Sequence, residues 1–191
     1  KKMKLTYCAA WLIGLSTLSA SAAQNNSTNN IKGKDGYYYL QKGYTDRDVA
    51  EFYWRSLEGW SEKPGNVAKY FTPDGRFELP YAPVNDFPDL FSSASQGREA
   101  ITRYFSRMSQ YLGNLKYSAP ETWKIIPARE PGVYTFEYTS SGKLKQTGGD
   151  YNQLFIATVK IKDGQIALAH EFWDPYVALR DFGLIKKTDA N

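Results

Sequence analysis

The segment DGQIALAHEFWDP, residues 163–175, carries the strongest structural signal in this chain. An Asp-Gly pair between two strand-like segments is a strong signal for a tight β-hairpin. We expect the two strands at about 151–161 and 165–174. Pro175 then allows a short terminal helix to begin, because proline is favoured in the first helical turn.

Upstream of this hairpin the sequence predicts more strands, and before them helices. Further strands are expected at about 115–127 and 133–141. Thr45 and Asp48 resemble a capping box at the start of a helix. The apolar face of this helix then recurs at helical spacing and consists of Val49, Phe52, Tyr53, Leu57 and Trp60.

Between that helix and the strands, three more elements are expected. A short helix over 66–71 precedes a strand whose alternating apolar residues are Phe77, Leu79 and Tyr81. A second long helix follows Gly97, with an apolar face that runs to Leu112. Helices early and strands late indicate an α+β fold with a mainly antiparallel sheet. Helices packed on one face of a strongly bent sheet would enclose a cavity.

The N-terminal segment has the three parts of a secretory signal peptide. Three lysines among the first four residues form a basic region, residues 5–18 are mostly apolar or small, and Ala20-Ser21-Ala22 is a cleavage motif. We expect residues 1–22 to be a signal peptide, with an uncleaved membrane anchor as the alternative. Cleavage predicts a periplasmic or secreted protein that has no membrane contact afterwards.

The rest of the chain divides into three parts. Residues 23–44 are expected to form a flexible polar leader, residues 45–184 the folded domain, and residues 185–191 a C-terminal tail. Loss of the signal lysines lowers the formal net charge from +4 to +1, which gives no argument for a nucleic acid partner.

Several kinds of chemistry are disfavoured by what the sequence lacks. Cys8 lies in the signal segment and His170 is the single histidine, so a zinc site built from cysteine and histidine is disfavoured. The glycine patterns of phosphate-binding and dinucleotide-binding loops are missing, as is the G-x-S-x-G pattern of a serine nucleophile. We therefore expect neither a metal nor a cofactor.

The end of the strand at 165–174 carries the candidate chemistry. His170, Glu171, Trp173 and Asp174 are polar or amphipathic groups in an otherwise apolar strand. A carboxylate buried there would have a raised pKa and could act as a general acid or base. Asp174 has the alternative role of capping the helix that starts at Pro175.

Strand alternation separates Glu171 from His170, so that only one of them faces the interior. With a two-residue turn at Asp163-Gly164, Ile156 would lie opposite Glu171 and Thr158 opposite Ala169. We expect Glu171 to point inward beside small side chains that leave room for a ligand. A single bulge would exchange the faces, so an inward His170 remains the alternative.

Several short motifs along the chain resemble the nuclear transport factor 2-like superfamily, in its SnoaL-like branch of the phenazine-biosynthesis A/B type. They span about residues 46–184 and are YFTPDG (70–75), GREAI (97–101), GDYN (149–152), DG (163–164), EFWDP (171–175) and LRDFGL (179–184). The resemblance implies a cone-shaped α+β barrel, in which three N-terminal helices pack on a strongly curved sheet around a pocket, and a homodimer.

The resemblance also implies roles for particular residues. The pocket glutamate and tyrosine of the phenazine-type proteins correspond to Glu171 and Tyr151, whereas the positions of their histidine and arginine hold Tyr104 and about Val67. Glu171, Tyr151, His170 and Asp174 are the candidate catalytic residues. The candidate residues for binding a small apolar or cyclic molecule are Phe77, Tyr81, Tyr104, Phe105 and Trp173.

Two functions remain open from the sequence. One is an isomerase, cyclase or lyase-type enzyme that uses Glu171 as an acid or base, with Tyr151 or Tyr104 donating to developing negative charge on oxygen. The other is a periplasmic module of the same fold that binds a small molecule or a partner without catalysis.

Overall fold

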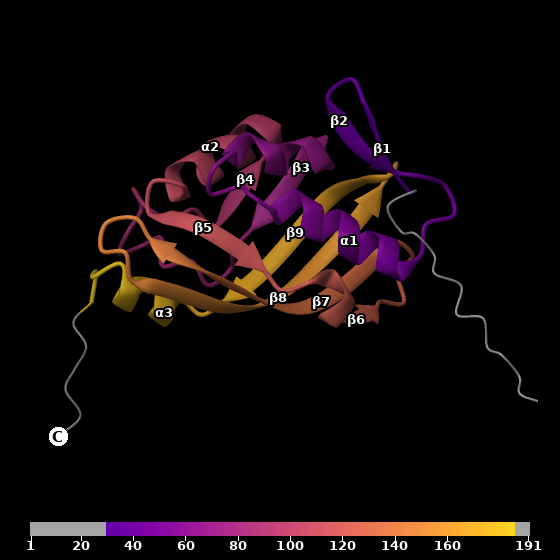
Figure 1. Ribbon diagram of the computed structural model, residues 1–191. Helices are drawn as coiled ribbons and strands as arrows, with labels where there is room; N and C mark the ends of the chain where they lie inside the picture. Colours follow the sequence, from indigo (N-terminus) through magenta and orange to yellow (C-terminus); the bar gives the residue numbers. More distant parts are fainter. Residues whose placement is uncertain (1–29, 186–191) are drawn as a thin grey trace, which may run out of the picture.

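The computed structural model describes residues 30–185 (Figure 1). The signal peptide, the first seven residues of the leader and all but the first residue of the tail lie outside this range. The elements in chain order are β1 (Ile31–Lys34), β2 (Tyr37–Leu40), α1 (Asp46–Leu57), the 3-10 helix η2 (Pro64–Tyr70), β3 (Phe71–Glu78), β4 (Ala94–Gln96), α2 (Arg98–Met108), β5 (Leu112–Tyr117), the 3-10 helix η3 (Pro120–Thr122), β6 (Lys124–Pro127), β7 (Val133–Leu144), β8 (Asp150–Lys162), β9 (Gln165–Trp173) and α3 (Pro175–Asp181).

A seven-stranded mixed sheet carries the fold, in the order β4-β3-β9-β8-β7-β5 with β6 also paired to β7. Only β3 and β9 pair in parallel, and the other described pairs of this sheet are antiparallel. Helices α1 and α2 lie on one side of the sheet in Figure 1, and the sheet bends around them. The predicted α+β class is confirmed, although the described strands form an open sheet and not a closed barrel.

Side-chain alternation on β7 and β8 builds the core beneath the helices. Every second residue of β8, from Tyr151 to Ile161, is buried, and its neighbours in between are mostly exposed. Helix α1 begins at the predicted capping box, in which the Thr45 hydroxyl accepts from the backbone N–H of Asp48 at 3.2 Å. Phe52 and Tyr53 of α1 are fully buried, and Tyr53 packs against Phe136 and Tyr138 of the sheet. The described helices include none that is long and apolar enough to cross a membrane.

Three predicted elements have different boundaries in the structure. The strand expected over 115–127 is two strands, β5 and β6, because Pro120 lacks the N–H that a continuous ladder needs and starts η3 between them. Helix α2 ends at Met108, so Leu112 opens β5 and is not part of the helical face. Strand β3 ends at Glu78, and Leu79 and Tyr81 lie in the loop beyond it.

The described part of the predicted flexible leader is folded instead into the hairpin of β1 and β2. Its turn, Asp35-Gly36, has positive φ at both residues, the conformation that Asp-Gly hairpin turns adopt. Leu40 is buried, and its N–H donates to the carbonyl of Gly164 at 2.8 Å. A side chain at Gly164 would place its Cβ 2.6 Å from the Leu40 carbonyl, so this contact requires glycine.

The pairing of β8 and β9 differs from the predicted register by one residue. Ala157 lies opposite Glu171 and Val159 opposite Ala169, where Ile156 and Thr158 were expected. A bulge next to the turn causes the shift, since Leu168 pairs with Lys160 but Ile166 pairs with Ile161. The prediction that Glu171 faces the interior is nevertheless correct, and its cross-strand neighbour is a small alanine.

Candidate functional site

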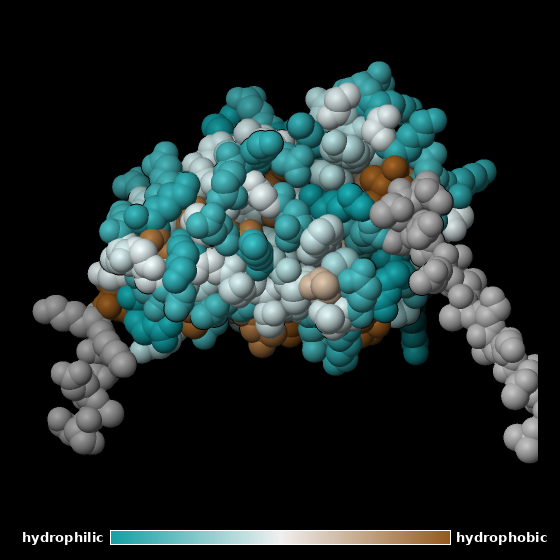
Figure 2. Space-filling view, in the orientation of Figure 1, coloured by the Kyte–Doolittle hydropathy of each residue, from teal (hydrophilic) through white to brown (hydrophobic). Residues whose placement is uncertain are grey.

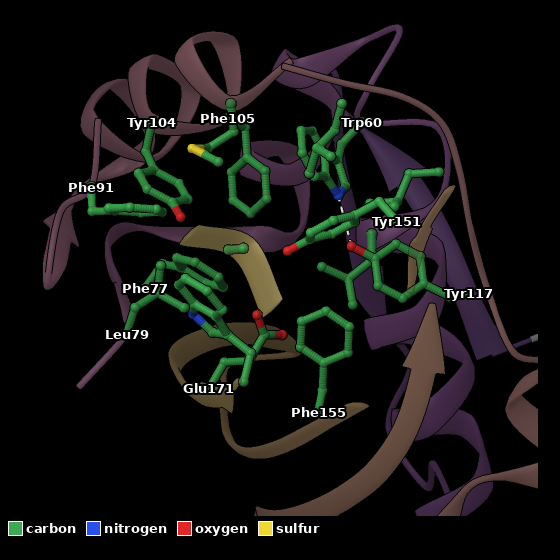
Figure 3. Close-up of a pocket in the computed structure, with 16 residues that line it drawn as sticks. Trp60, Phe77, Leu79, Phe91, Tyr104, Phe105, Tyr117, Tyr151, Phe155 and Glu171 are labelled. Atoms are coloured by element: carbon green, nitrogen blue, oxygen red, sulfur yellow. Dashed lines mark hydrogen bonds between the residues drawn. The ribbon is translucent and has the colours of Figure 1, made fainter. Parts of the chain in front are cut away.

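A buried cavity of about 50 Å³ lies between the helices and the inner face of the sheet (Figure 3). Nine of its sixteen lining residues are aromatic, and Glu171 is the one charged side chain among them. The aromatic residues are Trp60, Phe77, Phe91, Tyr104, Phe105, Tyr117, Tyr151, Phe155 and Trp173. The wall is therefore mostly apolar, and its polar groups are one carboxyl group, three phenol groups and two indole N–H groups.

Glu171 reaches the cavity because β9 alternates. Ala169, Glu171 and Trp173 face inward and are buried, whereas His170 and Phe172 face the other side of the sheet and are partly exposed. Only 5% of Glu171 is exposed to solvent. The small side chain of Ala157 opposite it leaves space on the inner face of the sheet.

Two buried tyrosines hold one oxygen of the Glu171 carboxyl group. Tyr53 of α1 donates to Oε2 at 2.9 Å, and Tyr138 of β7 donates to the same oxygen. The ring of Trp123 stacks on Tyr138 with 4.3 Å between ring centres and so restricts its position. Oε1 accepts no hydrogen bond from residues 30–185, and the carboxyl group points into the cavity in Figure 3.

Burial raises the pKa of Glu171 to about 7, although the hydrogen bonds from Tyr138 and Tyr53 pull it in the other direction. The apolar wall disfavours the charged form more strongly than the two phenols favour it. Near neutral pH the group therefore exists in both protonation states, as a general acid or base requires.

Three further tyrosines present hydroxyl groups to the cavity. Tyr117 accepts a hydrogen bond from the Trp60 indole N–H at 2.7 Å, and Tyr151 accepts one from the Gln153 amide at 3.2 Å. Neither these two hydroxyls nor that of Tyr104 donates to another described residue. Burial raises the pKa of all three phenols, so they keep their protons and remain hydrogen-bond donors.

Six of the nine predicted site residues line this cavity. They are Glu171, Tyr151, Phe77, Tyr104, Phe105 and Trp173. His170, Asp174 and Tyr81, which were also predicted, do not line it.

His170 lies on the opposite face of the sheet from the cavity. Its Nδ1 is 2.6 Å from Oε2 of Glu78, and its ring packs against Phe172. The hydrogen bond from His170 lowers the pKa of Glu78. His170 was the alternative inward group, and the observed register excludes it from the cavity.

Asp174 and Tyr81 have structural roles outside the cavity. The Asp174 carboxylate accepts from the N–H of Tyr176 at 2.9 Å and caps α3, which was its alternative role. Tyr81 is 63% exposed and packs its ring against Phe172 on the outer face of the sheet.

The residues that position Glu171 were not predicted from the sequence. Tyr53 was assigned to the apolar face of a helix, and Tyr138 was not singled out at all. A tyrosine at an inward position of an apolar pattern is itself a signal, because a buried phenol needs a hydrogen-bond partner. Its partner could not be found without the three-dimensional structure.

No protein-family model matches the chain. The chain is 25% identical over 129 residues to the uncharacterised protein YesE of Bacillus subtilis. The aligned region covers 68% of this chain and 78% of YesE. The chain is 26% identical over 113 residues to an uncharacterised PhzA/B-like protein of Pseudomonas aeruginosa, covering 59% of this chain and 74% of the relative.

Solved structures share the arrangement of helices and sheet. A candidate isomerase from Bacillus subtilis superposes with a TM-score of 0.57 at 22% identity, over 71% of this chain and 89% of that one. A candidate polyketide cyclase from Xanthomonas campestris superposes with a TM-score of 0.55 at 16% identity, over 72% of this chain and 99% of that one. The pinacolase BvnE from Penicillium brevicompactum superposes with a TM-score of 0.55 at 12% identity, over 70% of this chain and 89% of that one. At these identities the likeness shows the fold alone.

Proposed function

We propose that this chain, which has the fold of the nuclear transport factor 2-like superfamily, is an acid-base enzyme that moves a proton on a small, uncharged, largely apolar molecule. Glu171 is the proton carrier. The observation that carries the proposal is the asymmetry of its carboxyl group. Two phenols hold Oε2, whereas Oε1 accepts no hydrogen bond from the described part of the chain and faces an aromatic cavity.

The reaction type follows from the polar groups around Glu171. In its ionised form Oε1 takes a proton from a carbon next to a carbonyl group. The electron pair of that C–H bond forms a C=C bond, and the π pair of the carbonyl group moves onto its oxygen. Tyr104 or Tyr151 donates to this oxygen and stabilises its developing negative charge. Where the substrate has a C=C bond β,γ to the carbonyl, the intermediate is a dienolate. Return of the proton from Glu171 to its γ carbon re-forms the C=O bond, leaves the C=C bond conjugated with it, completes an isomerisation and restores the ionised enzyme.

The names of structural neighbours are compatible with this chemistry. One neighbour is described as a candidate isomerase, another as a candidate polyketide cyclase and a third as a pinacolase. Because one fold hosts many reactions, these names support a small-molecule site without choosing the reaction.

Deuterium exchange tests the proposal without knowledge of the natural substrate. Small cyclic ketones and enones are incubated with the protein in D₂O near pH 7, and incorporation at carbon is followed by NMR or mass spectrometry. We expect exchange above the buffer rate with the wild type and none above it with Glu171→Gln. If the panel binds but no wild-type exchange occurs, the second function, a binding module without catalysis, is favoured.

We also propose that the protein is exported and that residues 1–22 are removed. The support is the sequence pattern of the first 22 residues, which ends in Ala20-Ser21-Ala22. The intact mass of protein recovered from the periplasm is expected to correspond to a chain that begins at Ala23 or within two residues of it. A membrane-bound product of full length would contradict this.

We further propose that the protein forms a homodimer. The outer face of the sheet exposes Leu154 (61%), Ile156 (44%) and Ile126 (44%), with Phe172 beside them. Figure 2 shows apolar surface along the lower edge of the molecule, where β7 and β8 lie in Figure 1. Pairing of two such faces about a two-fold axis would cover these side chains.

Light scattering checks the dimer. The wild type should give about twice the chain mass at micromolar concentration, and Leu154→Glu with Ile156→Glu should give a monomer, because each dimer would bury four added carboxylates. Leu184→Glu, a change at an exposed leucine near the end of α3, is the control and should remain a dimer. A monomeric wild type refutes this part of the proposal.

A further inference from the structure

The cavity is closed to a ligand of the size that its aromatic wall would suit. Of the side chains that line it, all except Tyr117 belong to residues less than a tenth exposed. Its volume of about 50 Å³ is well below the roughly 150 Å³ of a cavity that accommodates benzene. An element of the wall must therefore move before a ring-shaped molecule can enter.

A second hollow lies outside the cavity, next to the end of α3. This outer groove, of about 300 Å³, is formed by residues 86–90 together with Tyr111, Gln146, Phe182 and Leu184. Residues 86–90 belong to the long loop between β3 and β4, which also supplies Leu79 and Phe91 to the cavity wall. The same loop therefore borders both spaces.

Phe182 separates the outer groove from the cavity. Its ring stacks on Tyr151 with 5.7 Å between ring centres and on Tyr111 with 5.5 Å. Tyr151 lines the cavity, whereas Tyr111 and Phe182 line the groove. Displacement of Phe182 would uncover Tyr151 from the side of the groove.

Helix α3, which carries Phe182 at its end, is attached in a way that allows such a displacement. At the start of α3, the side-chain amide of Gln153 makes two hydrogen bonds to the backbone of Asp174. The N–H of Asp174 donates to Oε1 of Gln153 at 3.3 Å, and Nε2 of Gln153 donates to the carbonyl of Asp174 at 2.8 Å. Beyond this hinge, no side-chain hydrogen bond among residues 30–185 ties Pro175–Phe182 to another element. The helix is held there by apolar contacts alone, with Ala178 forming part of the cavity wall.

Charge along this route disfavours an anionic ligand. Asp86 and Asp89 border the groove, and the residues that line the cavity include no lysine, arginine or histidine. Arg107 lies 5.7 Å from the centre of the Tyr104 ring but does not line the cavity, and its guanidinium donates to Ser92. An anion would have to pass two carboxylates and then lose its hydration without a cationic partner.

We propose that α3 is a lid, that Phe182 is the gate between the outer groove and the cavity, and that the ligands admitted carry no negative charge. The inference rests on the proposed function for the identity of the site. It adds the route by which a ligand reaches that site and the exclusion of negatively charged ligands.

Thiol labelling tests the gate without a substrate. In a Cys8→Ser background, Met108→Cys places the only thiol of the chain in the cavity wall, on α2 and not on the lid. The rate at which this thiol reacts with neutral methyl methanethiosulfonate is measured first. The rates with two charged reagents of similar size follow, the anionic sulfonatoethyl and the cationic trimethylammonioethyl methanethiosulfonate. Each rate is normalised to the rate for the unfolded chain.

We expect Phe182→Ala to speed labelling by about tenfold or more, because two aromatic pairs are lost. The matched control, Tyr176→Ala, removes an exposed ring from the same helix and should leave the rate within about twofold. The anionic reagent should be at least about fivefold slower than the cationic one. Leu115→Cys, on β5 of the cavity wall, replaces Met108→Cys as the reporter if the latter does not fold.

Two results would overturn the proposal. Labelling that occurs only at the rate of global unfolding, and is unchanged by Phe182→Ala, would show that α3 is not a lid. Equal normalised rates for the anionic and cationic reagents would remove the charge selectivity. Because labelling requires no catalysis, a gate that passes this test while deuterium exchange fails would leave the route intact and refute only the enzyme.

Discussion

Glu171→Gln is expected to stabilise the protein at pH 7 by roughly 3 kcal/mol more than at pH 4. Burial raises the pKa of Glu171 from 4.5 to about 7, so the folded state keeps this proton at pH values where the unfolded chain has lost it. The burial penalty is nearly absent at pH 4, grows as the pH rises above 4.5 and levels off above about 7. Glutamine avoids the penalty, and its carbonyl oxygen can still accept from Tyr53 and Tyr138.

Thermal melts of both proteins at the two pH values measure this effect. For a chain of this size the difference corresponds to roughly 6–12 °C in melting temperature at pH 7. Glu121→Gln, which neutralises an exposed glutamate, is the control and should give a difference between the two pH values near zero. If Glu171→Gln gives the same result as this control, Glu171 titrates as a surface group and the proposed chemistry loses its base.

Tyr138→Phe is expected to raise the pKa of Glu171 further and to destabilise the protein most at high pH. The hydrogen bond from Tyr138 is the first of the two interactions that lower this pKa, and Tyr53 alone would then hold Oε2. A hydrogen bond to a charged group contributes about 1.5–3 kcal/mol, and one to a neutral group about 1 kcal/mol. The loss in unfolding free energy should therefore be larger at pH 8 than at pH 5.

Tyr134→Phe provides a matched control for this experiment. Tyr134 lies on the same strand and is buried to a similar extent, but its hydroxyl group makes no hydrogen bond to a described residue. Removal of this hydroxyl group should lower the free energy of unfolding by less than about 0.5 kcal/mol and leave the pKa of Glu171 unchanged. Urea unfolding of both variants at pH 5 and pH 8 compares them. Equal losses for Tyr138→Phe at the two pH values would contradict its role in holding the charged form.

Local signals in the sequence predicted most of the fold. The capping box at Thr45 and the Asp-Gly turn at 163–164 mark boundaries that the structure confirms, because each depends on neighbouring residues alone. The hairpin at 31–40 carries the same Asp-Gly signal, but the Asn-rich composition before it led to the prediction of a flexible leader. Long-range contacts hold this hairpin, among them the hydrogen bond from Leu40 to Gly164 and the stacking of Tyr38 on Tyr70, and no local pattern reveals them.

The candidate site was predictable only in part, because its long-range contacts leave no local signal in the sequence. Alternation placed Glu171 on the inner face correctly, even though the bulge beside the turn changed its cross-strand partner. The tyrosines that hold it are separated from it by 118 and 33 residues, so their contact depends on tertiary packing. Phe182 likewise belongs to a motif of the sequence, but its position over Tyr151 depends on how α3 packs.

The most direct test of a buried acid or base at Glu171 is its own titration. Carbon-13 NMR of side-chain carboxyl groups in glutamate-labelled protein resolves individual glutamates, and the signal that disappears in Glu171→Gln assigns Glu171. We predict a pKa of about 7 for that signal, with burial as the cause of the rise. A midpoint at or below 4.5 would mean that solvent or a cation stabilises the carboxylate, and it would contradict the proposed chemistry.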